Sequence, residues 1–303
     1  MDTPDFYHRP VLLHEAVGGL AIKNDGVYVD ATFGGGGHSR EILKKLGDAG
    51  RLVAFDQDSD AWKNKPDDSR LIDVHENFRY MRRFLKLHGF AEVDGILADL
   101  GVSSYQFDTG ERGFSIRFDG PLDMRMDNRG ELTAEQVLKT YSEQQLHKMF
   151  EQYGEVRNAK QLAKHIADNR GKATLNTIGA LKAMLEQVVK GIPNKYLAQV
   201  FQALRIEVND ELGALKDLLE QSVQCLKQGG RLSIITFHSL EDRMVKQFMK
   251  RGVWGEVETD VFGRATTEPK LKPLTNKPVE ATEQETKENP RARSARLRIA
   301  ERL

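Results

Sequence analysis

A run of four glycines between an acid and a histidine constrains this chain more than any other feature. Residues 30–38 read DATFGGGGH, after a short run of β-branched and aromatic residues and before an amphipathic stretch at 39–46. The first flank predicts a buried strand and the second a helix. Glycines let the backbone approach a ligand closely, and a helix N-terminus presents free N–H groups to it. Together they predict the start of a nucleotide-binding α/β domain.

The acid that ends the first predicted strand separates this loop from the common dinucleotide fingerprint. That fingerprint, Gly-x-Gly-x-x-Gly, has no acid leading into the loop. Here Asp30 leads into it, and the frame that starts at Gly35 has Arg40 in place of the third glycine. A carboxylate at this position suits a ligand with a cationic group, such as the amino group or sulfonium of S-adenosylmethionine. The alternative is that Asp30 only caps the following helix.

Three later predicted strands also end in residues that suit such a ligand. Asp56 ends the second strand, about 20 residues after the glycines, where nucleotide-binding folds place an acid on the ribose hydroxyls. Phe78 follows the third strand and is either a face for adenine or a core residue, and Asp99 ends the fourth. Ligands of open parallel sheets bind beyond the carboxyl ends of the strands. We therefore expect Asp30, Asp56, Phe78 and Asp99 to converge.

A block of helical periodicity interrupts the alternation of strands and helices. Capping-box patterns and apolar residues spaced three or four apart recur between positions 132 and 190. An irregular stretch at 107–127 precedes this block, and its aromatic and methionine content favours an ordered wall of the active site. The prediction is an α/β domain formed by residues 1–110 and 211–303, an inserted helical substrate-recognition domain at 111–210, and a mobile segment at about 264–288.

The composition narrows the classes of protein. Lysine plus arginine and aspartate plus glutamate number 45 each, so any nucleic acid must be recognised by local basic patches. The single cysteine, Cys225, excludes an internal disulfide and a cysteine-based zinc cluster, and we predict no metal site. The sequence shows neither a signal peptide nor a run of roughly 20 apolar residues. We expect a soluble cytoplasmic protein that does not contact a membrane.

The motifs together resemble the MraW-type (methyltransferase H) family of small-subunit ribosomal RNA methyltransferases. They cover nearly the whole chain, and the long ones are very specific. The matching stretches are HRPV at 8–11, the loop at 30–38, DGILADLGVSSYQ at 94–106, GFS at 113–115, DGPLDMRM at 119–126, FQALRI at 201–206, and residues 229–243 and 289–294.

The resemblance implies a fold, a reaction and a set of site residues. The fold is a Rossmann-like sheet of a class I S-adenosylmethionine-dependent methyltransferase with an inserted all-helical domain. The reaction is N4-methylation of a cytidine in the decoding region of 16S ribosomal RNA, with S-adenosylmethionine as cofactor. The partner is small-subunit ribosomal RNA, free or in the assembled small subunit, and a homodimer is left open. The implied cofactor contacts are Gly36, Gly37, His38, Asp56, Phe78, Asp99 and Gln106, to which the strand-end argument adds Asp30.

Asp99 is the candidate catalytic residue. The amino nitrogen of cytosine is a poor nucleophile because its lone pair is conjugated with the ring, whereas a sulfonium methyl group is already reactive. The enzyme must mainly hold N4 in line with the S–CH₃ bond and accept its hydrogen bonds. We expect the Asp99 carboxylate, or a carbonyl next to it, to be that acceptor, and the stretch 107–127 to receive the target base.

One departure from the family pattern and three other functions remain. The family commonly carries His-Pro-Ala-Thr-Arg before the FQA motif, whereas residues 192–196 read IPNKY, so the roles of that histidine and arginine cannot be carried over. A nicotinamide-dependent oxidoreductase is disfavoured by Asp30 and the missing third glycine. A DNA cytosine-N4 methyltransferase would carry a Pro-Pro-aromatic motif where residues 100–103 read LGVS. A non-catalytic RNA-binding assembly factor would share the fold without the chemistry.

Overall fold

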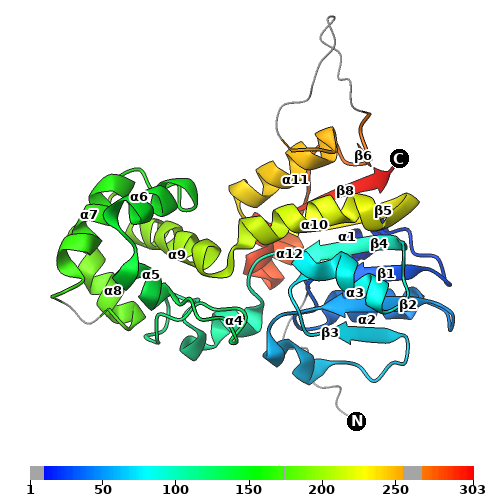
Figure 1. The fold of residues 1–303 in the computed structure, drawn as a ribbon, viewed down its shortest axis with the longest axis horizontal. Coiled ribbons are helices and arrows are strands. Elements are labelled where there is room, and N and C mark those ends of the chain that lie inside the picture. The colour runs from blue at the N-terminus through cyan, green and yellow to red at the C-terminus, as the bar shows by residue number, and fades with distance from the viewer. Residues whose placement is uncertain (1–9, 173–174, 255–267) are drawn as a thin grey trace, which may run out of the picture. The chain divides into compact units, whose positions relative to one another are not determined.

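The structure, a computed structural model, describes residues 10–172, 175–254 and 268–303 (Figure 1). The chain divides into two compact units: a first unit of residues 1–101 and 213–303, and a second unit of residues 102–212. The sequence analysis instead starts the second unit at residue 111 and ends it at 210. Residues 8 and 9 of the first motif, and residues 264–267 of the segment predicted to be mobile, lie outside the described residues.

The first unit is built on a mixed sheet with the strand order β3-β2-β1-β4-β5-β8-β6, and β7 pairs with β8. The neighbours from β3 to β5 are parallel, whereas β8 is antiparallel to β5, β6 and β7. From β1 the chain builds outward through β2 and β3, then returns to place β4 on the other side of β1. Such a switch point is where open α/β sheets bind ligands. The strands are β1 (Val27–Asp30), β2 (Arg51–Phe55), β3 (Leu71–Val74), β4 (Val93–Asp99), β5 (Leu226–Thr236), β6 (Leu271–Pro273), β7 (Val279–Glu280) and β8 (Arg296–Arg302).

Helices cover both faces of this sheet because successive strand residues point to opposite sides. Val29 and Ile96 face a core shared with α3 (Met81–Leu87), α10 (Glu211–Cys225) and α11 (Ser239–Arg251). Their neighbours Tyr28 and Leu97 face a second core, shared with α1 (Leu13–Gly19) and α2 (Gly37–Lys45). Figure 1 shows α10 and α11 running beside the strands. The predicted Rossmann-like α/β architecture is confirmed.

The segment at 264–288 has regular structure in its described part, which corrects the expectation of a purely mobile stretch. It contains β6, β7 and α12 (Glu283–Glu288), and η4 (Pro290–Ser294) follows. The polar composition of this segment does not predict its strands. β6 and β7 are stabilised by backbone hydrogen bonds to β8 rather than by a large apolar core of their own. Leu271 is the buried apolar residue that fixes β6 to the sheet.

The second unit is helical in its described residues and has its own core. Thr133 and Ser142 form the capping boxes that the sequence predicts. Apolar residues of the irregular stretch 107–127, among them Phe114 and Leu122, are buried in that core, so much of its apolar content stabilises the unit. The elements are α4 (Ser104–Asp108), η3 (Gly110–Arg112), α5 (Ala134–Thr140), α6 (Glu143–Gln152), α7 (Ala159–Asn169), α8 (Ile178–Leu185) and α9 (Pro193–Asn209). Within the described ranges, no helix is both long and apolar enough to cross a membrane.

Candidate active site

Asp30, at the end of β1, ties together the two sides of the glycine loop. Its Oδ1 accepts a hydrogen bond from the amide of Thr32 at 3.1 Å, and its Oδ2 accepts one from the hydroxyl of Ser39 at 2.7 Å. Thr32 begins the loop and Ser39 lies in the first turn of α2. Asp30 is 0% exposed. We therefore expect it to position the loop and to act on a ligand through its charge, rather than through the direct contact that the sequence predicts.

Asp56, one residue beyond β2, holds the same loop from the neighbouring strand. Its Oδ2 accepts a hydrogen bond from the amide of Gly34 at 2.8 Å, and its Oδ1 accepts one from the amide of Asp58 at 2.8 Å. Asp58 in turn caps the helix η1 (Ser59–Asn64), as its position in the sequence predicts. Each carboxylate oxygen has a second lone pair. Asp56 can therefore accept further hydrogen bonds from a ligand while it holds the loop.

The middle of the loop requires glycine because its outer side is packed. The backbone at Gly36 has a φ of 74°, and a Cβ there would lie 2.7 Å from the Phe33 ring. A Cβ on Gly37 would lie 2.0 Å from Cγ of Pro10. Glycine is therefore required at both positions, because a ring packs directly against the loop backbone at each of them.

Asp99, at the end of β4, carries a buried oxygen with no hydrogen-bond partner. Its amide donates to the Thr32 hydroxyl at 2.7 Å, and its Oδ2 lies 3.8 Å from Nδ1 of His38. The other carboxylate oxygen, Oδ1, is buried and has no partner among the described residues. A buried acceptor without a donor costs roughly 1–3 kcal/mol. We infer that a ligand supplies the donor that Asp99 Oδ1 lacks.

His38 stands beside Asp99 in a fixed orientation. Its Nε2 lies 3.1 Å from the carbonyl oxygen of Val11, so Nε2 carries a proton and donates it. The imidazole is buried.

The three strand-end carboxylates share a desolvated site. Burial raises the pKa of Asp30. It also raises the pKa of Asp56 to about 7 and that of Asp99 to about 6, and the neighbouring Asp30 adds to both shifts. His38 partly opposes the shifts of Asp30 and Asp99. A cationic ligand would stabilise the ionised forms, so the electrostatics suit a positively charged cofactor.

Phe78 opens the short helix η2 (Phe78–Tyr80) beyond β3, and it is half-buried against the core under α3. The preceding Asn77 accepts a hydrogen bond from the amide of Arg79 at 2.9 Å. Its Nδ2 donates to Oε1 of Gln57 at 2.8 Å, which joins this strand end to the residue after Asp56. Part of Phe78 packs in the core and part stays accessible. The predicted contact with adenine stays a prediction.

Three stacked rings connect the loops that follow β1, β2 and β3. The Trp62 ring lies between Phe33, with a centroid distance of 4.5 Å, and His75, with one of 4.6 Å. Both pairs are nearly parallel, with interplanar angles of 12° and 10°. The stack supports the glycine loop from the side, so the loop does not depend on its own hydrogen bonds alone.

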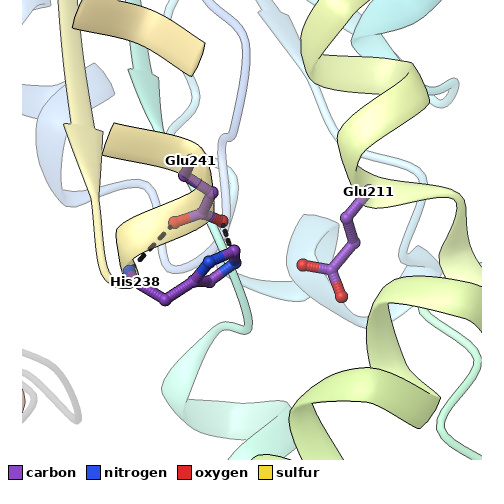
Figure 2. A group of neighbouring side chains, drawn as sticks. All are labelled: Glu211, His238 and Glu241. Atoms are coloured by element: carbon purple, nitrogen blue, oxygen red, sulfur yellow. Dashed lines mark hydrogen bonds and ion pairs between the residues drawn. The ribbon is translucent and has the colours of Figure 1, made fainter. Parts of the chain in front are cut away.

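His238 lies just beyond the carboxyl end of β5. Figure 2 shows Glu241 reaching back to it: Oε2 accepts hydrogen bonds from the amides of Phe237 at 2.8 Å and His238 at 3.3 Å. Glu241 Oε1 lies 3.1 Å from His238 Nε2, and both side chains are nearly enclosed. Since β5 pairs with β4, this pair occupies the strand end next to Asp99.

Asp242 lies in the first turn of α11 but does not cap it. The N-cap is His238. Asp242 instead receives the guanidinium of Arg298 on β8 at 2.7 Å and 3.1 Å, and that of Arg296 at 3.3 Å. These bonds fix α11 to the antiparallel strand, an interaction between distant residues that spacing along the chain cannot reveal.

Comparison with known proteins assigns the family. The family model of the MraW methylase family matches residues 5–303. The chain belongs to the MraW methylase family. The protein named ribosomal RNA small subunit methyltransferase H of Flavobacterium johnsoniae is 52% identical over 305 residues and covers 100% of both chains. Its namesake from Cytophaga hutchinsonii is 53% identical over 302 residues, which is 98% of this chain and 99% of that relative. Among solved structures, an rRNA methylase from Streptococcus thermophilus aligns over 98% of each chain at 10% identity with a TM-score of 0.43, a likeness too weak to add to this assignment.

Membership of the MraW methylase family confirms the resemblance, the methyltransferase activity and S-adenosylmethionine as methyl donor. The site of the first unit fits that cofactor on two independent grounds. Desolvation raises the pKa of Asp56 and that of Asp99, and a sulfonium would offset both shifts. Asp99 Oδ1 is a buried acceptor with no hydrogen-bond partner among the described residues.

Gln106 belongs to the second unit, whereas the other predicted cofactor contacts belong to the first. Its Oε1 accepts a hydrogen bond from the amide of Ser103 at 3.0 Å, and its amide donates to Ser103 Oγ at 3.2 Å, which completes the capping box of α4. Glu211, also drawn in Figure 2, binds Arg205 in this unit at 2.7 Å and 3.0 Å. The predicted cofactor contact of Gln106 stays a prediction.

Several residues that hold the site together are not predicted from the sequence. Thr32 links Asp30 to Asp99, Ser39 completes the Asp30 contacts, and Asn77 joins two strand ends. Some of these leave a local signal, because Asp or Asn two residues before a bonded amide is typical of an Asx turn. The contact of the Thr32 hydroxyl with the Asp99 amide leaves no such signal, since it depends on how β1 and β4 pair.

Proposed function

We propose that this MraW family protein transfers the methyl group of S-adenosylmethionine to N4 of a cytidine in the decoding region of 16S ribosomal RNA. Relatives of about half identity over the full length are named ribosomal RNA small subunit methyltransferase H, which supports ribosomal RNA as substrate. The observation that carries the chemistry is the buried, unpartnered Oδ1 of Asp99 at the end of β4.

On the cofactor side, the strand ends of the first unit divide the work of binding. Asp56 accepts hydrogen bonds from the ribose hydroxyls through the free lone pairs of its two oxygens. The accessible part of Phe78 offers an apolar face to adenine, and the backbone at Gly36 and Gly37 lies along the cofactor. S-adenosylmethionine, when bound, supplies an electrophilic methyl group. Asp30 keeps the loop in place and contributes its negative charge.

On the acceptor side, Asp99 holds the amino group. Its Oδ1 accepts a hydrogen bond from N4–H, which turns the nitrogen toward the methyl donor and draws its lone pair out of conjugation with the ring. Its Oδ2 stays near His38 Nδ1. The proton that N4 loses on methylation can leave toward this carboxylate, whose pKa is raised to about 6, a value suited to exchange near neutral pH.

The second unit recognises the RNA around the target base. The base must leave any helix in which it is stacked, and its receptor needs flat faces and cations. In the stretch 107–127, the Arg117 guanidinium lies over the Phe107 ring at 5.3 Å, and the Phe118 side chain is exposed. Rings and guanidinium planes of this kind stack on unpaired bases. We assign these residues to the reception of the extruded cytidine.

The direct test is methyl transfer followed by mapping of the product. Small subunits from cells that lack this protein are incubated with the enzyme and tritiated S-adenosylmethionine, and the modified nucleotide is identified by mass spectrometry. The expected product is a single N4-methylated cytidine in the decoding region. Protein-free 16S ribosomal RNA serves as a parallel substrate, since assembled subunits and free RNA are both candidate partners.

Two controls distinguish the proposed function from its alternatives. Double-stranded and single-stranded DNA must remain unmodified, because transfer to DNA cytosine would favour the rival DNA methyltransferase. Asp99→Asn keeps the shape of the side chain but replaces one acceptor oxygen by a donor, and it should bind cofactor while losing transfer. Binding of RNA without any transfer by the wild-type protein would point to an assembly factor instead.

A further inference from the structure

The helix α3 carries an unusually one-sided charge for a chain with no net charge. From residue 77 to residue 91 the sequence contains four arginines or lysines and neither aspartate nor glutamate. Arg82, Arg83 and Lys86 are exposed, and they form no ion pair with any residue that the structure describes. Elsewhere many basic side chains are paired within a helix or a turn, as Lys44 is with Glu41. The cations of α3 are thus uncompensated.

These cations border an open groove between α3 and α10. The groove has a volume of about 780 Å³. It is lined by Arg79 of η2, by the three cationic side chains of α3 and by the amides of Gln221 and Gln224 on α10. Tyr80 and Leu87 also line it and remain 48% and 73% exposed. All of its lining residues belong to the first unit. A groove with cations, amide donors and an exposed aromatic ring has the chemistry of a nucleic-acid backbone site.

The groove is held in shape before any partner binds. Gln221 donates a hydrogen bond to the carbonyl of Arg79 at 2.6 Å and accepts one from the amide of Arg82 at 2.8 Å. Arg79 binds Asp217 at 3.0 Å and 2.8 Å through its Nε and a terminal nitrogen. Two helices are therefore fixed to each other at the start of α3. Arg79 is charge-compensated, so Arg82, Arg83 and Lys86 are the cations left for a ligand.

The position of the groove connects it to the site already described. Its first lining residue, Arg79, directly follows Phe78, the candidate adenine contact, and both lie in η2 at the carboxyl end of β3. A chain that follows the groove toward η2 therefore arrives at the strand ends that hold Asp56 and Asp99. This placement favours a polymer over a small anion, because only a polymer can occupy the groove and reach the site together.

We propose that the α3–α10 groove binds the sugar–phosphate backbone of the RNA that contains the target nucleotide, with Arg82, Arg83 and Lys86 on the phosphates. The inference rests on the proposed function in one respect, namely that the bound polymer is the RNA substrate. An acidic protein surface is the competing occupant. It is disfavoured by the exposed Tyr80, which offers a stacking face for a base.

The test compares two charge-reversal variants of the full chain. Arg82→Glu with Lys86→Glu reverses two exposed cations of the groove, one helical turn apart. Lys246→Glu with Lys250→Glu does the same on α11, where both lysines are exposed and neither lines the groove. For each protein, the affinity for protein-free 16S ribosomal RNA is measured against salt concentration, and the affinity for S-adenosylmethionine is measured by calorimetry.

The groove variant should lose RNA affinity by roughly tenfold or more near 0.1 M salt. The slope of its log affinity against log salt concentration should become shallower by about 1.5, because each phosphate contact contributes roughly 0.7–0.9 to that slope. Its affinity for S-adenosylmethionine should match that of the wild type, which shows that it is folded. The α11 variant should keep both the affinity and the slope. Unchanged RNA binding by the groove variant overturns the inference. An equal loss of affinity in both variants also overturns it, because RNA binding would then depend on the overall charge of the protein and not on the groove.

Assembled small subunits separate the remaining cases. If the groove variant binds free RNA normally but loses affinity for subunits, the groove contacts a protein and the inference is wrong. If wild-type protein methylates no cytidine, yet its RNA binding depends on Arg82 and Lys86, the proposed function fails while the RNA groove stands. Failure of the inference and failure of the proposed function therefore give different results.

Discussion

The affinity for S-adenosylmethionine should rise steeply between pH 6 and pH 8, because Asp56 must lose its proton to accept the ribose hydroxyls. Burial raises the pKa of Asp56 to about 7 and that of Asp99 to about 6 in the unliganded protein. A group with a pKa of about 7 is roughly 9% ionised at pH 6 and roughly 91% at pH 8, a tenfold difference or about 1.4 kcal/mol. Asp99 adds about a factor of two over the same range. The dissociation constant should therefore fall about twentyfold as the pH rises.

Isothermal titration calorimetry at half-unit steps of pH measures this directly. The Asp56→Asn variant cannot ionise at this position, so it should bind more weakly at pH 8 and show only the small dependence due to Asp99 and to the cofactor itself. Dividing the wild-type curve by the variant curve removes the titration of the amino group of the cofactor. A wild-type affinity that does not change between pH 6 and pH 8, or a variant with the full wild-type slope, would refute the assignment of Asp56 to the ribose.

Three further substitutions test other parts of the structure. Asp99→Ala should abolish methyl transfer, measured with tritiated donor, and near-normal turnover would remove Asp99 from the mechanism. Gly37→Ala places a Cβ 2.0 Å from the proline ring that packs on the loop, so thermal unfolding should show a loss of about 1–3 kcal/mol, whereas Gly18→Ala, with no atom within 4 Å, should cost nothing. Arg298→Ala leaves the buried Asp242 carboxylate, among the described residues, with the longer contact to Arg296. Denaturant unfolding should therefore show a loss of about 3 kcal/mol in the free energy of unfolding. A loss below about 1 kcal/mol would contradict this account.

Much of the first unit follows from the sequence because its strands are short and apolar and end in polar residues at the same edge. The fourth predicted strand ends at Asp99, as β4 does. The convergence of Asp30, Asp56 and Asp99 follows from the parallel order of β1, β2 and β4. Local pattern and general rules on parallel sheets are sufficient for this part.

Other features depend on which distant segments meet, and local pattern does not determine that. β6 and β7 are stabilised by β8, so a polar composition hides their order. The enclosure of Asp30 by Thr32 and Ser39 depends on the shape of the loop. The groove on α3 was visible in the sequence only as a basic helix. Its second wall comes from α10, more than a hundred residues later. Gln221 fixes that wall by donating a hydrogen bond to the Arg79 carbonyl and accepting one from the Arg82 amide.

The position of β8 in the sheet has a consequence for biosynthesis. β8 fills the place between β5 and β6 and pairs with β5 over six residues, from Arg296 to Glu301. The helical second unit, in contrast, is one continuous stretch with its own core and emerges from the ribosome long before β8. The second unit can therefore fold early. Until β8 is synthesised, the first unit has an unpaired edge at β5, and such an edge is prone to incorrect association. Translation arrested shortly before residue 296 should leave a half-finished sheet that depends on chaperones.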